Sequence, residues 1–304
     1  MKISVIIPVY NALEDVKILF ESLNKYFNFQ LGDITIINDY SREETTFFLN
    51  DFVSKNANYK LINNEENLGF IKTCNKGMQI ADGDVVVLLN SDTKITSGFC
   101  EKIVKCFNTD SNIATASPMA DGCYYSVPKP KNWSLEKMNL VLNRRHKCCY
   151  PIIPEAEGYC YCIRKEVIEK QGFFDEIYGK GYNDEVDYSF RAITNGWKNV
   201  LIDDLYIYHK NSASFGVKNT EELKKQNDVP FKARWGNFRQ EYINKINWVD
   251  PTFAIEKELF PMKFICRNIR HFVQNIFSVK NSHNKTHKII KILGISVSIK
   301  RKSI

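Results

Sequence analysis

Short apolar runs alternate with longer amphipathic segments over the first 95 residues, and this alternation restricts the fold more than any other feature. The apolar runs are rich in β-branched residues and predict strands at 2–9, 34–37, 59–62 and 85–89. Between them, apolar residues at helical spacing predict helices at 12–27, 41–55 and 68–81. Strands that alternate with helices form parallel sheets with right-handed crossovers. We therefore expect an α/β fold.

The rest of the chain is less regular. Spacing predicts helices at 96–108, 134–145, 164–171 and 183–195, a strand at 200–208 and a polar helical stretch at 220–246. Residues 117–133 contain three prolines and a glycine and are expected to form a loop. Asn11 is expected to cap the first helix, and Ser41 with Glu44 matches a capping box for the second.

The expected organisation is one domain followed by a tail. The domain covers 1–250, with a first half at 1–95 where strands and helices alternate and a second half at 96–250, and the tail covers 251–304. The first strand is not followed by G-x-G-x-x-G, and there is no Walker A sequence. These absences argue against a dinucleotide-binding domain and against a P-loop enzyme.

The fourth predicted strand ends in three polar residues, Asn90, Ser91 and Asp92. In open α/β sheets, ligands bind just beyond the carboxyl ends of the strands. A carboxylate at that position can hold Mg²⁺ or Mn²⁺, and the cation can hold a diphosphate. We therefore expect a nucleoside diphosphate ligand, with Asp92 as a metal ligand. The alternative for Asp92 is the N-cap of the helix that starts near Ser97.

Several short motifs occur in the order and spacing of a known family. Val5–Asn11 resembles its opening strand, Asn38–Ser41 its Asp-Asp-Gly-Ser turn, and Asn90–Asp92 its Asp-x-Asp motif with Asn in place of the first acid. The run between them is matched by Asn67–Phe70, Asn75–Gly77 and Ala81–Asp84. Over about residues 1–215 the chain resembles family-2 glycosyltransferases of the GT-A fold.

This resemblance implies a mixed, mostly parallel sheet and an inverting transfer of sugar from a nucleotide-diphosphate donor. It also implies that 1–95 is the nucleotide-binding half of the domain and 96–250 the acceptor-binding half. Asp39 would recognise the base; otherwise it is a turn aspartate that caps nearby amides. Lys72 would reach the phosphates or the base, or is a solvated helix lysine. Gly158 lies in Glu155–Tyr159, which resembles the segment that lines the donor sugar and acceptor. The implied donor-binding residues are Pro8, Tyr10, Asp39, Asn67, Gly69, Lys72, Asn90, Ser91 and Gly158.

Three acids, Asp184, Glu185 and Asp187, lie at the start of a predicted helix. One acid would satisfy the helix dipole, and adjacent carboxylates raise each other's pKa, which suits a general base. By resemblance Glu185 takes the base position, with Asp184 as the alternative. His209 follows a predicted strand and is expected to bind the metal or the diphosphate; the alternative is a structural histidine.

The positive charge of the chain is concentrated at its C-terminus. The formal net charge is +7, and residues 259–304 contribute +10 without an acid, so residues 1–258 carry −3. Apolar residues at helical spacing with basic residues between them predict a basic amphipathic helix at 263–277. We expect the tail to be helical and to contact an anionic membrane surface; a helix packed on the domain is the alternative. No known nucleic-acid module occurs, so nucleic acid is not an expected partner.

The N-terminal run 3–9 contains Pro8 and ends in polar residues, unlike a signal peptide, and no run approaches the length of a membrane span. Nine irregularly spaced cysteines suggest neither a disulfide framework nor a zinc site. A cytoplasmic location is therefore expected, peripheral to the inner face of the cell membrane. The acceptor would be a saccharide or a lipid-linked saccharide of surface polysaccharide synthesis.

Two other functions are alternatives to glycosyl transfer. A catalytically inactive homologue that acts as an assembly partner is suggested by Asn90, which replaces an acid. A sugar-phosphate nucleotidyltransferase would need a glycine-rich, Arg-containing loop after the first strand, and Pro8–Asn11 does not match one. Manganese-dependent turnover of a sugar donor would separate these functions from glycosyl transfer.

Overall fold

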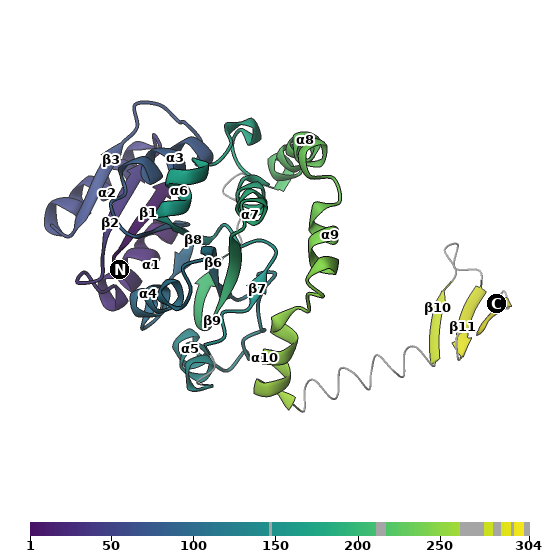
Figure 1. Ribbon diagram of the computed structural model, residues 1–304. Coiled ribbons are helices and arrows are strands. Elements are labelled where there is room, and N and C mark those ends of the chain that lie inside the picture. The colour runs from purple at the N-terminus through teal and green to yellow at the C-terminus, as the bar shows by residue number, and fades with distance from the viewer. Residues whose placement is uncertain (146–147, 211–216, 262–276, 282–286, 293–294, 301–304) are drawn as a thin grey trace. The chain divides into compact units, whose positions relative to one another are not determined.

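The computed structural model describes residues 1–145, 148–210, 217–261, 277–281, 287–292 and 295–300, with the backbone alone for 217–221 and 277–300. The chain divides into two compact units, Met1–Asp250 and Pro251–Ile304. The first unit contains a mixed nine-stranded sheet flanked by helices (Figure 1).

The strand order in this sheet is β3-β2-β1-β4-β8-β6-β9-β5, and β7 pairs with β9. Strands β1 to β4 are joined by parallel pairing, as is β6 to β9. Strand β8 runs antiparallel to β4 and β6, and β5 and β7 run antiparallel to β9. The strands are β1 Ile3–Val9, β2 Gly32–Asn38, β3 Tyr59–Asn63, β4 Val85–Leu89, β5 Thr93–Lys94, β6 Ile113–Ala120, β7 Ile152–Ile153, β8 Cys160–Arg164 and β9 Lys198–His209.

Helices cover both faces of the sheet. Strand β1 illustrates this arrangement, because its alternate residues are buried on opposite sides. Val5 and Ile7 belong to a core shared with α1, α2 and α4, whereas Ile6 faces α3. The helices of this unit are α1 Leu13–Tyr26, α2 Glu43–Lys55, α3 Phe70–Ile80, α4 Phe99–Thr109, α5 Leu135–Arg144, α6 Lys165–Gln171, α7 Asp184–Thr194, α8 Val217–Trp235 and α9 Phe238–Lys245. A 3₁₀ turn, Glu176–Tyr178, precedes α7.

The strands and helices expected in the first 95 residues are confirmed, but the two expected helix caps are wrong. Helix α1 begins after Ala12 and α2 after Arg42, neither with a side-chain cap. Asn11 instead accepts a hydrogen bond from the Arg42 amide (2.9 Å), and the Asn11 amide donates to Ser41 Oγ (2.8 Å). These residues tie together the loops that follow β1 and β2, which are neighbours in the parallel sheet.

Three strands in the second half, β6, β7 and β8, were not expected. Strand β6 occupies the beginning of the expected loop 117–133, and Pro118 is tolerated because the register with β9 shifts beside it. Strand β8 is short and buried throughout, so its sequence shows no alternation of polar and apolar residues. With these strands, residues 96–250 join the same sheet as the first half of the unit.

The second unit contains helix α10, Pro251–Leu259, and an antiparallel sheet of β10 Phe277–Asn281, β11 His287–Ile292 and β12 Ile295–Lys300. The expectation of a helical tail is therefore wrong at 277–281, 287–292 and 295–300, which are strands. Residues 295–300 alternate between β-branched and polar residues, which is the period of a strand. Most of the predicted amphipathic helix, 263–276, lies outside the described residues.

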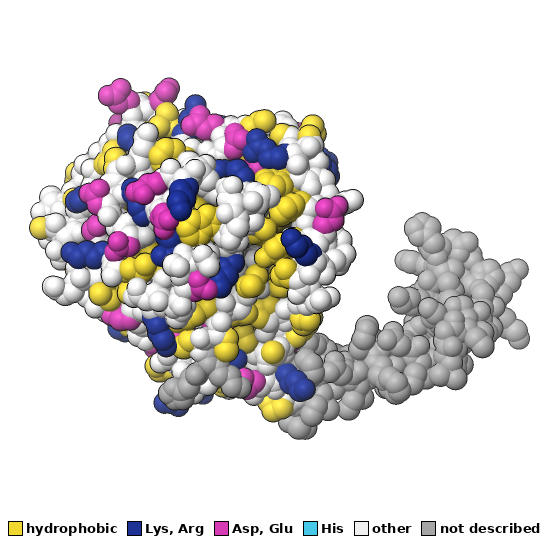
Figure 2. Space-filling model, in the orientation of Figure 1, with side chains coloured by type: hydrophobic (Ala, Val, Ile, Leu, Met, Phe, Trp, Pro, Cys, Tyr) yellow, Lys and Arg dark blue, Asp and Glu magenta, His cyan; other side chains and the backbone are white. Residues whose placement is uncertain are grey.

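Charged side chains are interspersed on the face of the first unit shown in Figure 2, where basic and acidic groups lie next to one another. This mixture agrees with the small net charge of residues 1–258. Among the described residues, no helix has both the length and the apolar character that a membrane crossing requires. The cysteines in the described part are free thiols: Cys74, Cys100, Cys106, Cys123, Cys148, Cys149, Cys160 and Cys162.

Gly77 of α3 packs closely against strand β1, and this contact generates a prediction about stability. A Cβ atom added at Gly77 of α3 would lie 2.2 Å from Ile6 Cγ2 on β1. We expect Gly77→Ala to lower the free energy of unfolding by about 1–3 kcal/mol, measured by urea denaturation. Gln79→Ala, on the exposed side of the same helix, is the matched control and should leave the midpoint nearly unchanged. Equal stability of the two variants would contradict the close packing of α3 on β1.

Candidate active site

A cavity of about 860 Å³ opens where the carboxyl ends of β1, β2 and β4 lie side by side. Pro8 comes from the end of β1, Asp39 from the loop after β2, and Asp92 from the loop after β4. Helix α7 and the loop before it contribute to the same cavity. The residues predicted from sequence that line it are Pro8, Tyr10, Asp39, Asn67, Gly69, Asn90, Ser91, Asp92, Gly158, Asp184, Glu185 and His209.

Lys72 is the predicted site residue that does not line the cavity. It lies on α3 with its Nζ atom 3.8 Å from Glu176 Oε2, and both side chains are more than half exposed. This position matches the solvated helix lysine that was its alternative interpretation. No contribution of Lys72 to ligand binding follows from the structure.

The carboxylate of Asp39 organises the loop before α3. Its Oδ1 accepts hydrogen bonds from the Leu68 amide and from Asn64 Nδ2, both at 2.9 Å, and its Oδ2 accepts from the Gly69 amide at 2.9 Å. Asn67 Nδ2 donates to the backbone oxygen of Asp39 (3.2 Å). A carboxylate oxygen can accept two hydrogen bonds, so Oδ2 has the capacity to accept one more. Asp39 thus caps nearby amides, and base recognition by its remaining acceptor site stays a prediction.

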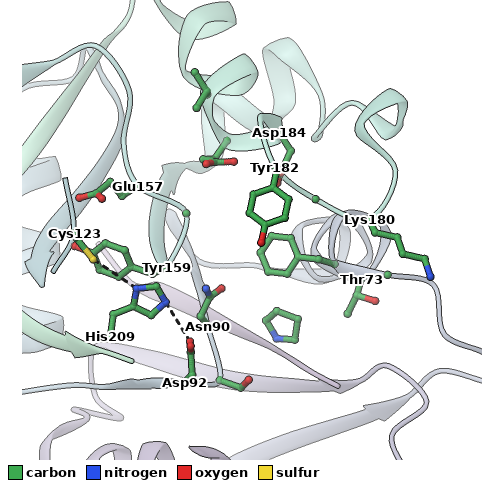
Figure 3. Close-up of a pocket in the computed structure, with 18 of the residues that line it drawn as sticks. Thr73, Asn90, Asp92, Cys123, Glu157, Tyr159, Lys180, Tyr182, Asp184 and His209 are labelled. Atoms are coloured by element: carbon green, nitrogen blue, oxygen red, sulfur yellow. Dashed lines mark hydrogen bonds and ion pairs between the residues drawn. The ribbon is translucent and has the colours of Figure 1, made fainter. Parts of the chain in front are cut away.

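Asp92 and His209 meet at the floor of the cavity, at the ends of two different strands. Asp92 Oδ1 lies 3.3 Å from His209 Nε2, and the two side chains are 11% and 14% exposed. Figure 3 shows the imidazole between Asp92 and Cys123, whose Sγ atom lies 3.6 Å from His209 Nδ1. The ring of Tyr159 stacks on the imidazole at a centroid distance of 4.9 Å.

The ligand atoms of Asp92 and His209 are of the types that bind divalent cations. A carboxylate oxygen and an imidazole nitrogen suit Mn²⁺, and both residues line the cavity. The described residues include no cluster of three or more His, Cys, Asp and Glu side chains that could hold a metal. Mg²⁺ and Mn²⁺ sites commonly use one or two protein ligands and take the rest from phosphate and water. The alternative interpretation of Asp92 as a helix N-cap is wrong, because Gly98 is the N-cap of α4.

The acids at the start of α7 differ sharply in environment. Asp184 is 2% exposed, and its Oδ2 atom has no hydrogen-bond partner among the described residues. Burial, and then the charge of Glu185, raise the pKa of Asp184 well above its ordinary value. Glu185 is half-buried; burial also raises its pKa, but a hydrogen bond from Asp184 and the charge of Lys224 oppose this increase. Burial therefore favours the protonated form of Asp184 more strongly than that of Glu185.

Asp187, the third acid, has a structural role. It is fully buried and accepts hydrogen bonds from Arg191, Arg234 and Trp235 at 2.8–2.9 Å and from Tyr178 at 3.1 Å. These contacts join α7 to the end of α8. The backbone turns sharply just before α7, where Tyr182 and Asn183 both adopt positive φ angles of 73° and 70°. Asn227 of α8 donates to the carbonyls of Tyr178, Gly181 and Tyr182 and holds this turn.

Several cavity residues were not predicted individually. Glu157 accepts hydrogen bonds from the amides of Tyr124 (2.8 Å) and Tyr125 (3.2 Å), and burial raises its pKa to about 7. It lies in a segment whose resemblance to the family was noted, but its partners are more than 30 residues away in sequence. The others include Thr73, Cys123, Tyr159, Lys180, Tyr182 and Lys224, and Figure 3 shows Glu157, Cys123 and Tyr159 grouped around His209.

Known proteins with similar sequences and folds are glycosyltransferases. Dolichol-phosphate mannosyltransferase of Pyrococcus furiosus is 26% identical over 174 residues, which are 56% of this chain and 48% of that protein. The matched region spans about half or less of the first curated relatives.

Two solved structures share the fold. Mannosyltransferase PcManGT from Pyrobaculum calidifontis, in complex with GDP-Man and Mn²⁺, aligns with a TM-score of 0.55 at 16% identity over 70% of this chain and 58% of that one. S. aureus TarS 1-349 with UDP-GlcNAc aligns with a TM-score of 0.52 at 18% identity over 76% and 67%. The expected GT-A fold is confirmed by these likenesses.

The family itself is shown by the sequence. Residues 4–172 match the family model for glycosyl transferase family 2, and this region is more than half of the chain. It includes the strand-end residues that form the floor of the cavity, from Pro8 to Asp92. The chain therefore belongs to glycosyl transferase family 2.

Proposed function

We propose that this protein is a metal-dependent, inverting glycosyltransferase that moves a sugar from a nucleoside diphosphate to an acceptor hydroxyl. The observation that carries the proposal is a single cavity lined at its floor by Asp92 and His209 and at its wall by Glu185. A cation-binding pair and a carboxylate base are the two groups that such a transfer needs. The solved relatives bound to GDP-Man and UDP-GlcNAc support a nucleotide sugar as donor.

The nucleotide would lie along the carboxyl ends of β1 and β2. Pro8, Tyr10, Asn67 and Gly69 line that part of the cavity, and the remaining acceptor site on Asp39 Oδ2 suits an N–H of the base. Asp92 and His209 would hold the cation, with Asn90 and Ser91 beside them. A bound Mn²⁺ or Mg²⁺ supplies charge neutralisation for the diphosphate leaving group.

Glu185 would act as the general base. Its carboxylate accepts the proton of the acceptor hydroxyl as the hydroxyl oxygen bonds to the anomeric carbon and the bond to the diphosphate breaks. A single displacement of this kind inverts the configuration at that carbon. Asp184 stays protonated and donates to Glu185, so it orients the base without accepting the proton. This division follows from the deeper burial of Asp184.

The two acids should respond differently to amide substitution. Glu185→Gln removes the base and should lower kcat by about 10²–10⁴-fold. Asp184→Asn mimics a protonated acid and keeps a donor toward Glu185, so its loss should be about tenfold or less. Release of nucleoside diphosphate, measured with purified protein, donor sugar and Mn²⁺, checks both. A larger loss in Asp184→Asn than in Glu185→Gln would assign the base to Asp184.

The raised pKa of Glu185 also sets a pH dependence. The base works as a carboxylate, so kcat should fall as the pH is lowered through the pKa of Glu185. Because burial raises that pKa, the midpoint should lie above the ordinary value of 4.5. Wild-type turnover that stays constant down to pH 4.5 would count against Glu185.

Asp92 should determine how Mn²⁺ affects nucleotide affinity. In the wild-type protein, Mn²⁺ should increase the affinity for UDP or GDP. In Asp92→Asn, the factor by which Mn²⁺ increases this affinity should be smaller by about tenfold or more. Isothermal titration with and without Mn²⁺ measures the effect. Asp82→Asn, an exposed carboxylate outside the cavity, is the control and should behave as wild type. A gain from Mn²⁺ that survives in Asp92→Asn would remove Asp92 from the metal site.

The proposal extends to the acceptor and the site of action. The ten basic residues of 259–304 support contact with an anionic membrane at the cytoplasmic face. A lipid-linked saccharide in surface polysaccharide synthesis would be held at such a surface. The Pyrococcus furiosus relative is named a dolichol-phosphate mannosyltransferase, and dolichol phosphate is a lipid phosphate. Failure of the protein to turn over any nucleotide sugar would instead favour a non-catalytic assembly partner, for which Asn90 is the supporting feature.

The tail should control membrane binding. Full-length protein should float with phosphatidylglycerol vesicles at low salt, since each basic residue near such a surface contributes about 1 kcal/mol. A chain that ends at Phe260 lacks all ten residues and should stay in the dense fraction. Phosphatidylcholine vesicles are the control for charge. Equal flotation of both chains would exclude the tail as the membrane contact.

A further inference from the structure

Tyr124 is an exposed aromatic residue in the wall of the cavity. Its side chain is 61% exposed, whereas the neighbouring Tyr125 is fully buried, and both line the cavity. Exposed large aromatic side chains at the edge of a cavity commonly mark a surface that binds a partner. The position of Tyr124 therefore raises the question of which part of the reaction it contacts.

The ring of Tyr124 is held in place from several directions. Glu157 accepts hydrogen bonds from the backbone amides of both tyrosines, which fixes the loop. The ring of Tyr125 meets that of Tyr124 edge-on, with centroids 4.8 Å apart and an interplanar angle of 88°. The Arg239 guanidinium lies over the Tyr124 ring, 5.6 Å from its centroid. A ligand that contacts this ring would meet a preorganised surface and pay little ordering entropy.

Paired polar groups surround the aromatic surface. Arg239 Nε lies 2.9 and 3.1 Å from the two carboxylate oxygens of Glu155, and Tyr125 Oη donates to Glu155 Oε1 at 3.1 Å. Arg239 Nη2 lies 3.4 Å from Tyr124 Oη. A pyranose ring matches this combination, because its C–H groups can face the negative π surface while its hydroxyls bond to charged and phenolic groups.

The location favours the acceptor over the donor nucleotide. The segment that carries Glu155 lies against Glu185, because a Cβ atom added at Gly158, three residues after Glu155, would lie 3.4 Å from Glu185 Cγ. The aromatic surface is thus on the side of the proposed base, whereas the nucleotide-binding residues lie at the ends of β1 and β2. A lipid chain would leave the charges of Glu155 and Arg239 facing apolar groups, which is costly.

We propose that Tyr124, together with Arg239 and Glu155, forms a subsite that binds a sugar ring of a saccharide acceptor. This inference rests on the proposed function for the identity of Glu185 as the base. The chemical class of the acceptor is therefore a saccharide with a ring next to the reacting hydroxyl. Tyr124 is a specificity-determining residue in this assignment, and it does not take part in bond breaking.

Saccharide binding to variant proteins tests the subsite. The probes are methyl α- and β-glycosides of glucose, galactose, mannose and N-acetylglucosamine, and their 1,4-linked disaccharides, followed by saturation-transfer NMR with UDP or GDP and Mn²⁺ present. We expect at least one probe to bind wild type and Tyr124→Ala to weaken it roughly tenfold, because truncating an aromatic anchor commonly costs this much. Tyr124→Phe keeps the ring and should retain most of the affinity.

Phe47→Ala provides the matched control, since it truncates another exposed aromatic side chain, on α2 and outside the cavity. It should bind the probes as wild type does. Three results would overturn the subsite: no probe binds, Tyr124→Ala binds as well as wild type, or Tyr124→Ala loses nucleotide affinity to the same extent as saccharide affinity. Donor hydrolysis by wild type, measured separately, reports on the proposed function and does not depend on the probes.

Discussion

The pairing of β5 with β9 is the contact on which the candidate site depends. Its register places Thr93 opposite His209, so the residue before Thr93, Asp92, reaches the imidazole. The Lys210 amide also donates to the Asp92 backbone oxygen at 3.1 Å and extends this pairing by one residue. Asp92 and His209 are more than 100 residues apart in sequence. A two-strand ladder only two residues long thus brings the end of β4 and the end of β9 to one point on the cavity floor.

Burial then separates two adjacent carboxyl groups into different tasks. Positive φ angles at Tyr182 and Asn183 begin α7 abruptly, and both acids that follow line the cavity, with Asp184 buried and Glu185 half-buried. Removing a carboxylate from water favours its neutral form, so the more buried acid keeps its proton. A neutral acid next to an ionised one can donate a hydrogen bond to it. In the proposed function, the same helix start supplies both the base and the group that orients it, and Asn227 of α8 stabilises the strained turn.

The sequence was most informative where short-range patterns determine position. Strands β1, β2 and β4 and their terminal residues Pro8, Asp39 and Asp92 follow from apolar runs and motif order. Asn11 and Ser41 were misassigned because a polar residue before a helix satisfies either a cap or a neighbouring loop, and only the parallel pairing of β1 with β2 decides which. Strands β6 and β8 and the tail strands were missed because buried or short strands lack a distinctive period. The contacts of Glu157 depend on tertiary structure alone.

The two sides of the cavity are also built differently, and this difference bears on specificity. The proposed donor side uses strand ends and an Asp39 network confined to residues that lie within about 30 positions of one another. The proposed acceptor side joins distant segments, with Arg239 of α9 bonded to Glu155 and Glu157 bonded to the Tyr124–Tyr125 loop. Side chains on loops and on a peripheral helix can change without disturbing the parallel strands that position Asp92. In the proposed function, acceptor choice can therefore vary while nucleotide and metal binding stay constant, which is the arrangement expected when function resides in loops on a rigid sheet.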